Sequence, residues 1–197
     1  MKFMLIFLLA LLWLPASLLA AEEIFEQLSP AEEKKLVAIG SNAAKLVSQR
    51  LMKTMLADIK AVGVAEAARG WSKSVGIIKE IADSLNLGMA IRRPTFQYRN
   101  PINKPDALDR VALNYFLGAE SPDAKYFTRK VTGKNGIHYV YYKPMYVKKK
   151  CLLCHSQNMA EDVKAVLNEK YPSDLSGDLS LGALRAAIRV EIPESAL

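Results

Sequence analysis

The two cysteines of this chain are the sequence feature that most restricts its fold and its chemistry. They occur as Cys151-Leu152-Leu153-Cys154, His155 follows directly, and the chain has no other cysteine. A spacing of three residues places both sulfur atoms on one side of a helical turn, where they can add to the two vinyl groups of a haem. The next residue can then direct its imidazole at the iron. The motif therefore predicts one covalently attached haem c, with His155 as the proximal iron ligand.

Two other uses of a cysteine pair fit the sequence less well. A redox disulfide of the thioredoxin type lies near the start of a βαβ unit, whereas this pair comes late in the chain, after a predicted hairpin. A zinc site would have to include His138, the only other histidine. The position of His155 directly beside Cys154 also does not match zinc-finger spacing. Haem with its iron is thus the cofactor we expect.

The N-terminal segment has the pattern of a secretory signal peptide. Residues 3–14 are apolar and follow Lys2, and small residues then lead up to position 21. We expect a signal peptide over residues 1–20 and a single domain over residues 21–197, because this length supports one core. The mature protein would be periplasmic, without stable membrane insertion. An N-terminal anchor facing the periplasm is the alternative, because Leu18 stands where cleavage sites prefer alanine.

The formal net charge is +7, and it becomes +6 without Lys2. In an exported protein this charge points away from nucleic acid and towards an acidic protein partner, an anionic membrane face or simply a solvated basic surface. Four lysines lie just before the cysteine motif: Lys143, Lys148, Lys149 and Lys150. Beside a haem edge they would steer an acidic redox partner, although a charge run is more commonly a solvated loop.

The pattern of apolar residues predicts an α+β domain, with long N-terminal helices packed on an antiparallel sheet. Ser29-Pro30-Ala31-Glu32 combines an N-cap, a proline at the first helical position and a capping-box glutamate. The helix that begins there should end near Gly63. The other expected elements are helices over 64–85 (interrupted around 70–76), 106–116 and 158–170, extended segments over 89–93 and 95–99, a hairpin of 126–132 and 137–147, and a last strand over 184–192.

Three sequence blocks follow one another in a specific order. They are the Arg93 to Asp106 segment with its Arg-Asn-Pro, Asn and Pro-Asp, the Tyr-Tyr-Lys-Pro-Met of 141–145 leading into 151–155, and the Gly-Asp of 177–178 with the strand in 182–193. Together they resemble a family of exported c-type haem proteins with a PAS-like fold, first recognised in cyanobacteria and common as sensor ectodomains in bacteria. The resemblance covers most of residues 88–193. It implies an antiparallel PAS-like sheet, with the haem held between the sheet and the N-terminal helices.

One departure from the family pattern concerns the sixth iron ligand. Some members place a cysteine in the second helical stretch for this role, and alignment of residues 66–71 puts Trp71 at that position. Tryptophan cannot bind iron, and the chain has no third cysteine, so thiolate ligation is excluded. The resemblance thus implies that Trp71 lies beside the haem, next to an open sixth site.

Other residues remain candidates for the sixth position. His138 shares a strand face with Val140 and Tyr142, and a single histidine on a strand is more often solvated or hydrogen-bonded than a ligand. Methionines on the first helix are more often core residues than ligands. The methionines of the mature chain are Met52, Met55, Met89, Met145 and Met159.

Arginines beside the first sequence block suit the two haem propionates, because guanidinium groups bind carboxylates in a bidentate way. The candidates are Arg92, Arg93 and Arg99, of which Arg93 and Arg99 fall on family positions. The alternative is that they hold the Asn100-Pro101 turn or face solvent.

Three functions fit these features. A sensor would bind a diatomic gas such as nitric oxide or carbon monoxide at an open iron site, and it would act through another protein because no signalling domain follows Leu197. A one-electron carrier would need a six-coordinate iron in both redox states. An enzyme acting on peroxide or nitrogen oxides would need a distal pair such as His138 and an arginine, and we assign no catalytic residue. We predict a periplasmic haem protein for redox or gas-ligand chemistry, without choosing its substrate, and the enzyme is the least favoured of the three functions.

Overall fold

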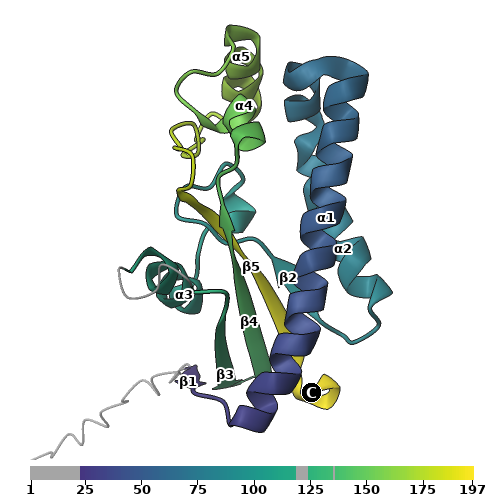
Figure 1. Ribbon diagram of the computed structural model, residues 1–197, viewed down its shortest axis with the longest axis vertical. Coiled ribbons are helices and arrows are strands. Elements are labelled where there is room, and N and C mark those ends of the chain that lie inside the picture. Colours follow the sequence, from purple (N-terminus) through teal and green to yellow (C-terminus); the bar gives the residue numbers. More distant parts are fainter. Residues whose placement is uncertain (1–22, 119–123, 135) are drawn as a thin grey trace, which may run out of the picture.

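The computed structural model describes residues 23–118, 124–134 and 136–197, so the predicted signal peptide lies outside the described residues. It consists of a long helix and a shorter one packed on a five-stranded antiparallel sheet (Figure 1). The predicted α+β class is therefore confirmed. Over the described ranges, no helix combines the length and apolar character needed to cross a membrane.

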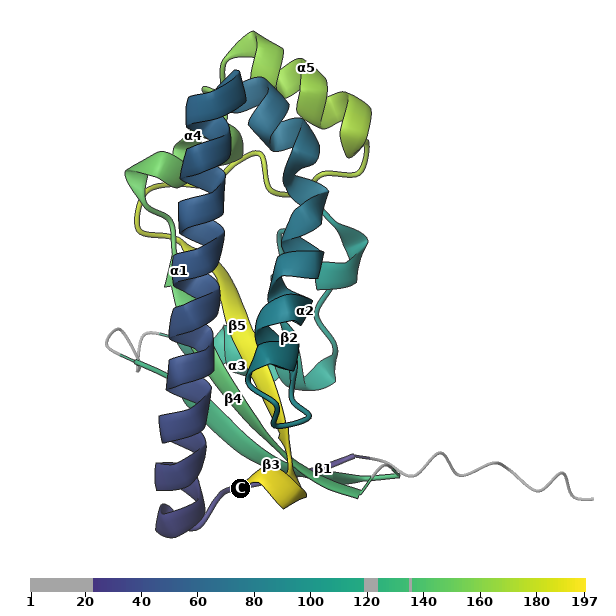
Figure 2. The same cartoon turned by 90° about the vertical axis from the view of Figure 1, so that its right-hand side faces the viewer.

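The first helix, α1 (Pro30–Arg69), begins at the predicted cap. Ser29 Oγ accepts a hydrogen bond from the Glu32 amide, and the Glu32 carboxylate accepts one from the Ser29 amide at 2.9 Å. The break expected near Gly63 is also present, because this glycine has φ 81° and ψ 172°, a conformation that other residues rarely adopt. Figure 2 shows the chain reversing there and running back beside the first part of α1. After the 3-10 turn η1 (Gly70–Lys73), the returning segment continues as α2 (Ser74–Ser84).

The sheet has the strand order β1-β3-β4-β5-β2, and every neighbouring pair is antiparallel. The predicted hairpin is confirmed as β3 and β4, and the predicted last strand as β5. The strands are β1 (Ile24–Glu26), β2 (Ala90–Arg92), β3 (Phe127–Gly133), β4 (Gly136–Tyr146) and β5 (Leu184–Pro193). The three-residue β1 was not predicted, because so short a segment carries no periodic pattern.

The extended segment predicted over 95–99 is wrong as a strand. Thr95 Oγ1 accepts a hydrogen bond from the Gln97 amide and donates one to the Arg185 carbonyl. A hydroxyl that bonds to nearby backbone in this way competes with a strand ladder. The segment therefore forms an irregular loop that is fixed to β5.

The two faces of the sheet are covered by different helices (Figures 1 and 2). Side chains alternate along β4, so Tyr139 and Tyr141 pack in the core beneath α1 and α2, whereas Val140 and Tyr142 pack beneath α3 (Ala107–Leu117). Helix α1 passes very close to the sheet at Gly40, where an added Cβ would lie 2.6 Å from the Cβ of Tyr141. Only glycine permits this approach.

A buried carboxylate fixes α3 on its face of the sheet. Asp109 is fully buried and accepts hydrogen bonds from Arg92 at 2.6 Å, from Arg189 at 3.2 Å and from the Tyr142 hydroxyl at 2.9 Å. The predicted helix over 106–116 is confirmed, with Asp106 as its N-cap rather than in its first turn.

The cysteine motif lies at the end of the sheet near the tip of the α1 hairpin (Figure 1). It forms the short helix α4 (Leu152–His155), and α5 (Glu161–Lys170) follows beside α1. The Arg69 guanidinium on α1 donates to both Glu169 oxygens on α5, at 2.9 and 3.0 Å. The helix predicted over 158–170 thus begins three residues later than expected.

Candidate functional site

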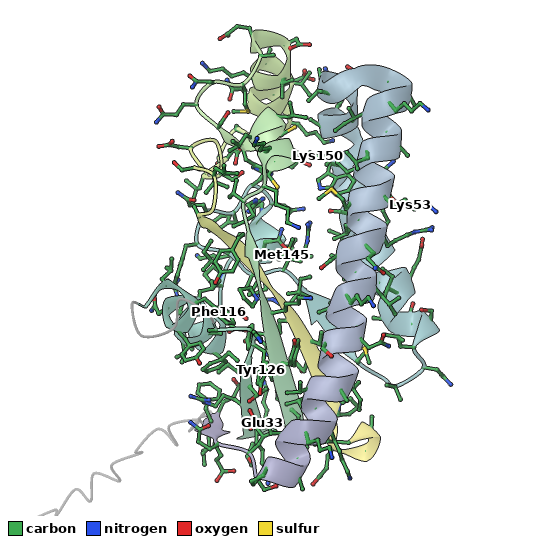
Figure 3. The ribbon with its side chains drawn as sticks, in the orientation of Figure 1. Glu33, Lys53, Phe116, Tyr126, Met145 and Lys150 are labelled. Atoms are coloured by element: carbon green, nitrogen blue, oxygen red, sulfur yellow. The ribbon has the colours of Figure 1, made fainter. Side chains whose placement is uncertain are left out.

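A largely apolar cavity lies between α1, the η1 turn and the cysteine motif, and its empty space, with the open solvent at its mouth included, is about 1300 Å³. One stripe of α1 lines it at helical spacing, including Leu51, Leu56 and Ile59. Figure 3 shows Met145 and Lys150 on the opposite side of the space, facing α1, whereas Lys53 points away from it. The cavity is thus built from both the helical layer and one end of the sheet.

Cys151, Cys154 and His155 all line this cavity, as their spacing predicted. They stand on the turn η3 (Lys149–Cys151) and on α4. Neither cysteine is in a disulfide. Cys154 is buried, and its burial raises the pKa of the thiol, whereas Cys151 is partly exposed. Two unpaired sulfurs and one imidazole are therefore presented to the same space.

The hydrogen bonds of His155 define which ring nitrogen carries the proton. Nδ1 lies 3.1 Å from the Ser176 carbonyl oxygen, and Nε2 lies 3.3 Å from Nη2 of Arg185. A guanidinium can only donate, so Nε2 must be the acceptor, and Nδ1–H donates to Ser176. Burial, reinforced by the charges of Arg185 and Arg99, holds the pKa of His155 well below its ordinary value of 6.5. The imidazole is therefore neutral and offers its Nε2 lone pair, the form in which histidine binds metals.

A second layer of polar groups holds the motif in place. Arg99 donates to the Asp174 carboxylate at 2.7 Å and to the Cys154 carbonyl oxygen at 2.6 Å. Asp174 accepts in turn from the amide and hydroxyl of Ser176, both at 2.7 Å. Ser176 is the residue that fixes Nδ1 of His155. Arg99 is thus linked to His155 through Asp174 and Ser176.

Arg93 lines the cavity, as its sequence position suggested, and so does Arg185, which the sequence reasoning missed. Burial lowers the pKa of each side chain to about 10. Arg185 shares β5 with two other charged residues, Arg189 and Glu191, so its place in the strand did not single it out. Asp174 and Ser176 gave a weak signal, since only their nearness to the Gly-Asp pair of 177–178 marks them. Arg92, in contrast, points to the other side of the sheet, where it binds Asp109.

The candidates for the sixth iron position are separated by the structure. Trp71 lines the cavity, as the family resemblance implied. Met52, Met55 and Met145 line it too, although the two helical methionines were expected to be core residues. Met89 belongs to the core between helices and sheet, and Met159 packs with α5 residues and Ala68.

His138 does not fit the role of a distal ligand. Its strand face is the predicted one, shared with Val140 and Tyr142, but this face lies beneath α3, whereas the cavity lies on the α1 side. Its Nε2 is 3.7 Å from a Glu191 oxygen. Seven residues of β4 also separate it from Met145, about 23 Å along an extended strand. The same separation removes it from a zinc site with the cysteines.

The lysines before the motif lie at the mouth of the cavity and near it. Lys148, Lys149 and Lys150 are exposed, and Lys150 lines the cavity, whereas Lys143 is half-buried on β4. No carboxylate among the described residues forms an ion pair with these four side chains. Lys150 therefore adds an exposed positive charge to the lining of the cavity.

Comparisons with known proteins agree with the resemblance found in the sequence blocks. A family model described as Tll0287-like matches residues 22–193. The crystal structure of the cyanobacterial haem protein Tll0287 is similar to this chain at 28% identity and a TM-score of 0.56, over 85% of this chain and 98% of that one. No curated protein matches the sequence.

Proposed function

This chain belongs to the Tll0287-like family, and we propose that it is a haem protein of the c type, with a single haem attached through Cys151 and Cys154 and bound at its iron by His155. The observation that carries this proposal is the arrangement of two free thiols and a neutral imidazole around one apolar cavity. The solved relative is itself a haem protein.

The lining of the cavity suits both parts of a haem. The porphyrin ring is apolar and needs an apolar slot, which the α1 stripe supplies. Its two propionates are anionic, and the lining contains Arg93, Arg99, Lys150 and Arg185 but, among the described residues, no aspartate or glutamate. The thiols of Cys151 and Cys154 are the groups that would form the two thioether bonds.

Bound haem would supply a redox-active iron that can also bind a diatomic gas. The residues of this chain would set its environment. His155 presents Nε2, and the Ser176 carbonyl fixes the orientation of its ring. Trp71 and the α1 stripe would exclude water from the distal side. We propose redox or diatomic-gas (NO/CO) sensing at an open or weakly bound sixth position, with Trp71 filling volume beside it.

The covalent attachment is tested by intact mass and by haem retention. The mature wild-type chain, produced in a host with cytochrome c assembly machinery, should exceed the apo mass by one haem. Cys151→Ala and Cys154→Ala should each reduce the haem retained on a denaturing gel, because each removes one thioether bond. A wild-type chain with the apo mass would overturn the proposal.

The open distal site is tested by optical spectra of the reduced protein with and without carbon monoxide. A five-coordinate ferrous iron should be high-spin and should bind carbon monoxide without first breaking a bond to the protein. Trp71→Ala should speed binding by removing bulk from the cavity, whereas Trp71→Phe should behave like the wild type. A low-spin ferrous spectrum that carbon monoxide does not change would exclude the open site.

A one-electron carrier with a six-coordinate haem is the second candidate, and a specific observation favours it. Met52, Met55 and Met145 line the same cavity as His155, and a thioether can be a sixth ligand. Replacing each with leucine, which has a similar volume, should then convert a low-spin spectrum to high-spin in one of the three variants. An enzymatic role on peroxide or nitrogen oxides has less support, because His138 lies away from the cavity.

We further propose that the protein is exported to the periplasm and acts there with a redox partner of acidic surface, facing the lysines at the cavity mouth. The charge of Lys148, Lys149 and Lys150 supports this choice. N-terminal sequencing of the periplasmic product should find the chain beginning at or near Ala21. Recovery of Met1 there would instead favour the anchored form.

A further inference from the structure

The cationic side chains of the cavity differ in whether an acidic group neutralises them. Arg99 forms an ion pair with Asp174 at 2.7 Å, with both side chains largely buried. Arg93 and Arg185 have no carboxylate partner within ion-pair distance anywhere in residues 23–118, 124–134 and 136–197. Lys150 stands at the mouth, where water can solvate it. The cavity therefore holds two sheltered guanidinium groups that form no ion pair with any described residue.

The hydrogen bonds of these two arginines are also incomplete. Arg93 donates from Nη2 to Ser74 Oγ at 3.2 Å, and its buried Nε has no partner. The guanidinium of Arg185 has one hydrogen bond among the described residues, from Nη2 to His155 Nε2 at 3.3 Å. A guanidinium carries five N–H donors, and leaving them unmet away from water is costly. Free guanidinium donors suit carboxylates, which they bind in a bidentate way, and two guanidinium groups match a ligand with two carboxylates.

We propose that Arg93 and Arg185 bind the two propionates of the haem, and that Arg99 is a positioning residue for the cysteine motif. This inference rests on the proposed function. Arg99 is already committed to Asp174 and to the Cys154 carbonyl. Arg185 contacts the same lone pair of His155 that would bind the iron, so its guanidinium must turn away when haem enters. The arginine side chain is long and flexible, so its N–H donors can then reach a propionate carboxylate.

The experiment uses covalently loaded protein whose haem carries ¹³C-labelled propionate carboxylates. Isotope-edited infrared spectra should show the carboxylate stretching bands moving in Arg93→Gln and in Arg185→Gln, because each variant removes a charged donor. In Arg185→Lys the carboxylate bands should lie closer to their wild-type positions than in Arg185→Gln. The bands should stay in place in Arg99→Gln and in Arg50→Gln, a control at an exposed arginine of α1 that does not line the cavity.

A second measurement does not depend on covalent attachment, so it can be made on variants that attach little haem during maturation. The full chain with Cys151→Ser and Cys154→Ser is titrated with hemin and with hemin dimethyl ester, which lacks the carboxylate charges. Arg93→Gln and Arg185→Gln should each weaken hemin binding by roughly tenfold or more, with the ester unaffected, because a charged hydrogen bond is lost only with the free acid. Arg99→Gln should weaken both ligands alike, since it acts through His155.

The outcomes separate this inference from the function beneath it. An apo mass for the matured wild-type chain overturns both. If the haem is covalent but its carboxylate bands move in Arg99→Gln and not in Arg185→Gln, the proposed function stands. The assignment of Arg185 is then overturned, and Arg99 is the residue that binds the propionate. Equal losses of hemin and ester binding in Arg185→Gln would also overturn the assignment, because they would show a structural effect.

Discussion

Asp174→Ala should destabilise the fold far more than the removal of a similar carboxylate from the surface. Asp174 and Arg99 are 12% and 11% exposed at their side chains, so the variant would leave a buried guanidinium without its counter-ion. Breaking a buried pair in this way costs about 3–5 kcal/mol. The amide and hydroxyl of Ser176 would lose their acceptor as well. Out of a total stability of about 5–15 kcal/mol, this is a large fraction.

The Arg69–Glu169 pair provides the matched control. It has the same chemistry and a similar distance, 2.9 Å, but its side chains are 39% and 68% exposed. Water solvates whichever charge is left behind, so Glu169→Ala should cost about 1 kcal/mol or less. The contrast between Asp174→Ala and Glu169→Ala therefore measures the effect of burial together with the loss of the Ser176 acceptor.

Urea unfolding of the haem-free chain, followed by circular dichroism, measures both variants. With a slope of about 2 kcal/mol/M, Asp174→Ala should lower the midpoint by roughly 2 M, and Glu169→Ala by about 0.5 M or less. The double variant Arg99→Met/Asp174→Leu should recover much of the loss, because it leaves no unpaired charge. If Asp174→Ala and Glu169→Ala differ by less than about 0.5 kcal/mol, the reasoning from burial is refuted.

Three further outcomes are expected. Asp109→Ala should cost about 3–5 kcal/mol in urea unfolding, because it leaves Arg92 and Arg189 without their buried carboxylate; a loss below about 1 kcal/mol would contradict the network. Gly40→Leu should cost roughly 1–3 kcal/mol by forcing α1 off the sheet, and unchanged thermal unfolding would show that the helix can shift freely. Hydrogen bonds from the Ser29 side chain and backbone lower the pKa of Glu32 from 4.5 to about 2, so its contribution is present above pH 4.5 and is lost as the pH falls towards 2. Glu32→Gln should flatten the decline of stability in that window, and an identical decline in both proteins would argue against the cap.

The local parts of the fold were predictable because their causes lie close together in the sequence. The capping box at Ser29, the break at Gly63 and the turn between β3 and β4 each depend on a few neighbouring residues. The segment over 95–99 was predicted to be extended but forms a loop, because its Thr95 hydroxyl bonds to the Arg185 carbonyl, ninety positions away. The β-strand propensity of a segment contains no information about a side-chain hydrogen bond to a distant part of the chain.

The site divides in the same way. Cys151, Cys154 and His155 are adjacent in the chain, so their shared direction and their chemistry follow from helical spacing alone. Which face of β4 carries His138 also followed from alternation. This face lies beneath α3 rather than α1 because of how the helices cover the sheet. Strand alternation shows which residues share a face, but it does not show which helix covers that face.

The charges around the cavity were decided only by the tertiary structure. From the sequence, Arg92, Arg93 and Arg99 were all candidates for binding carboxylates, and only the family resemblance favoured Arg93 and Arg99. In the folded chain, Arg92 pairs with Asp109 and Arg99 pairs with Asp174, whereas Arg93 has no carboxylate partner among the described residues. Arg185 comes from the last strand to lie beside His155. A guanidinium has the same charge at every position in a sequence. Whether that charge is already neutralised depends on which distant carboxylate the fold places beside it, and only the packed chain determines that.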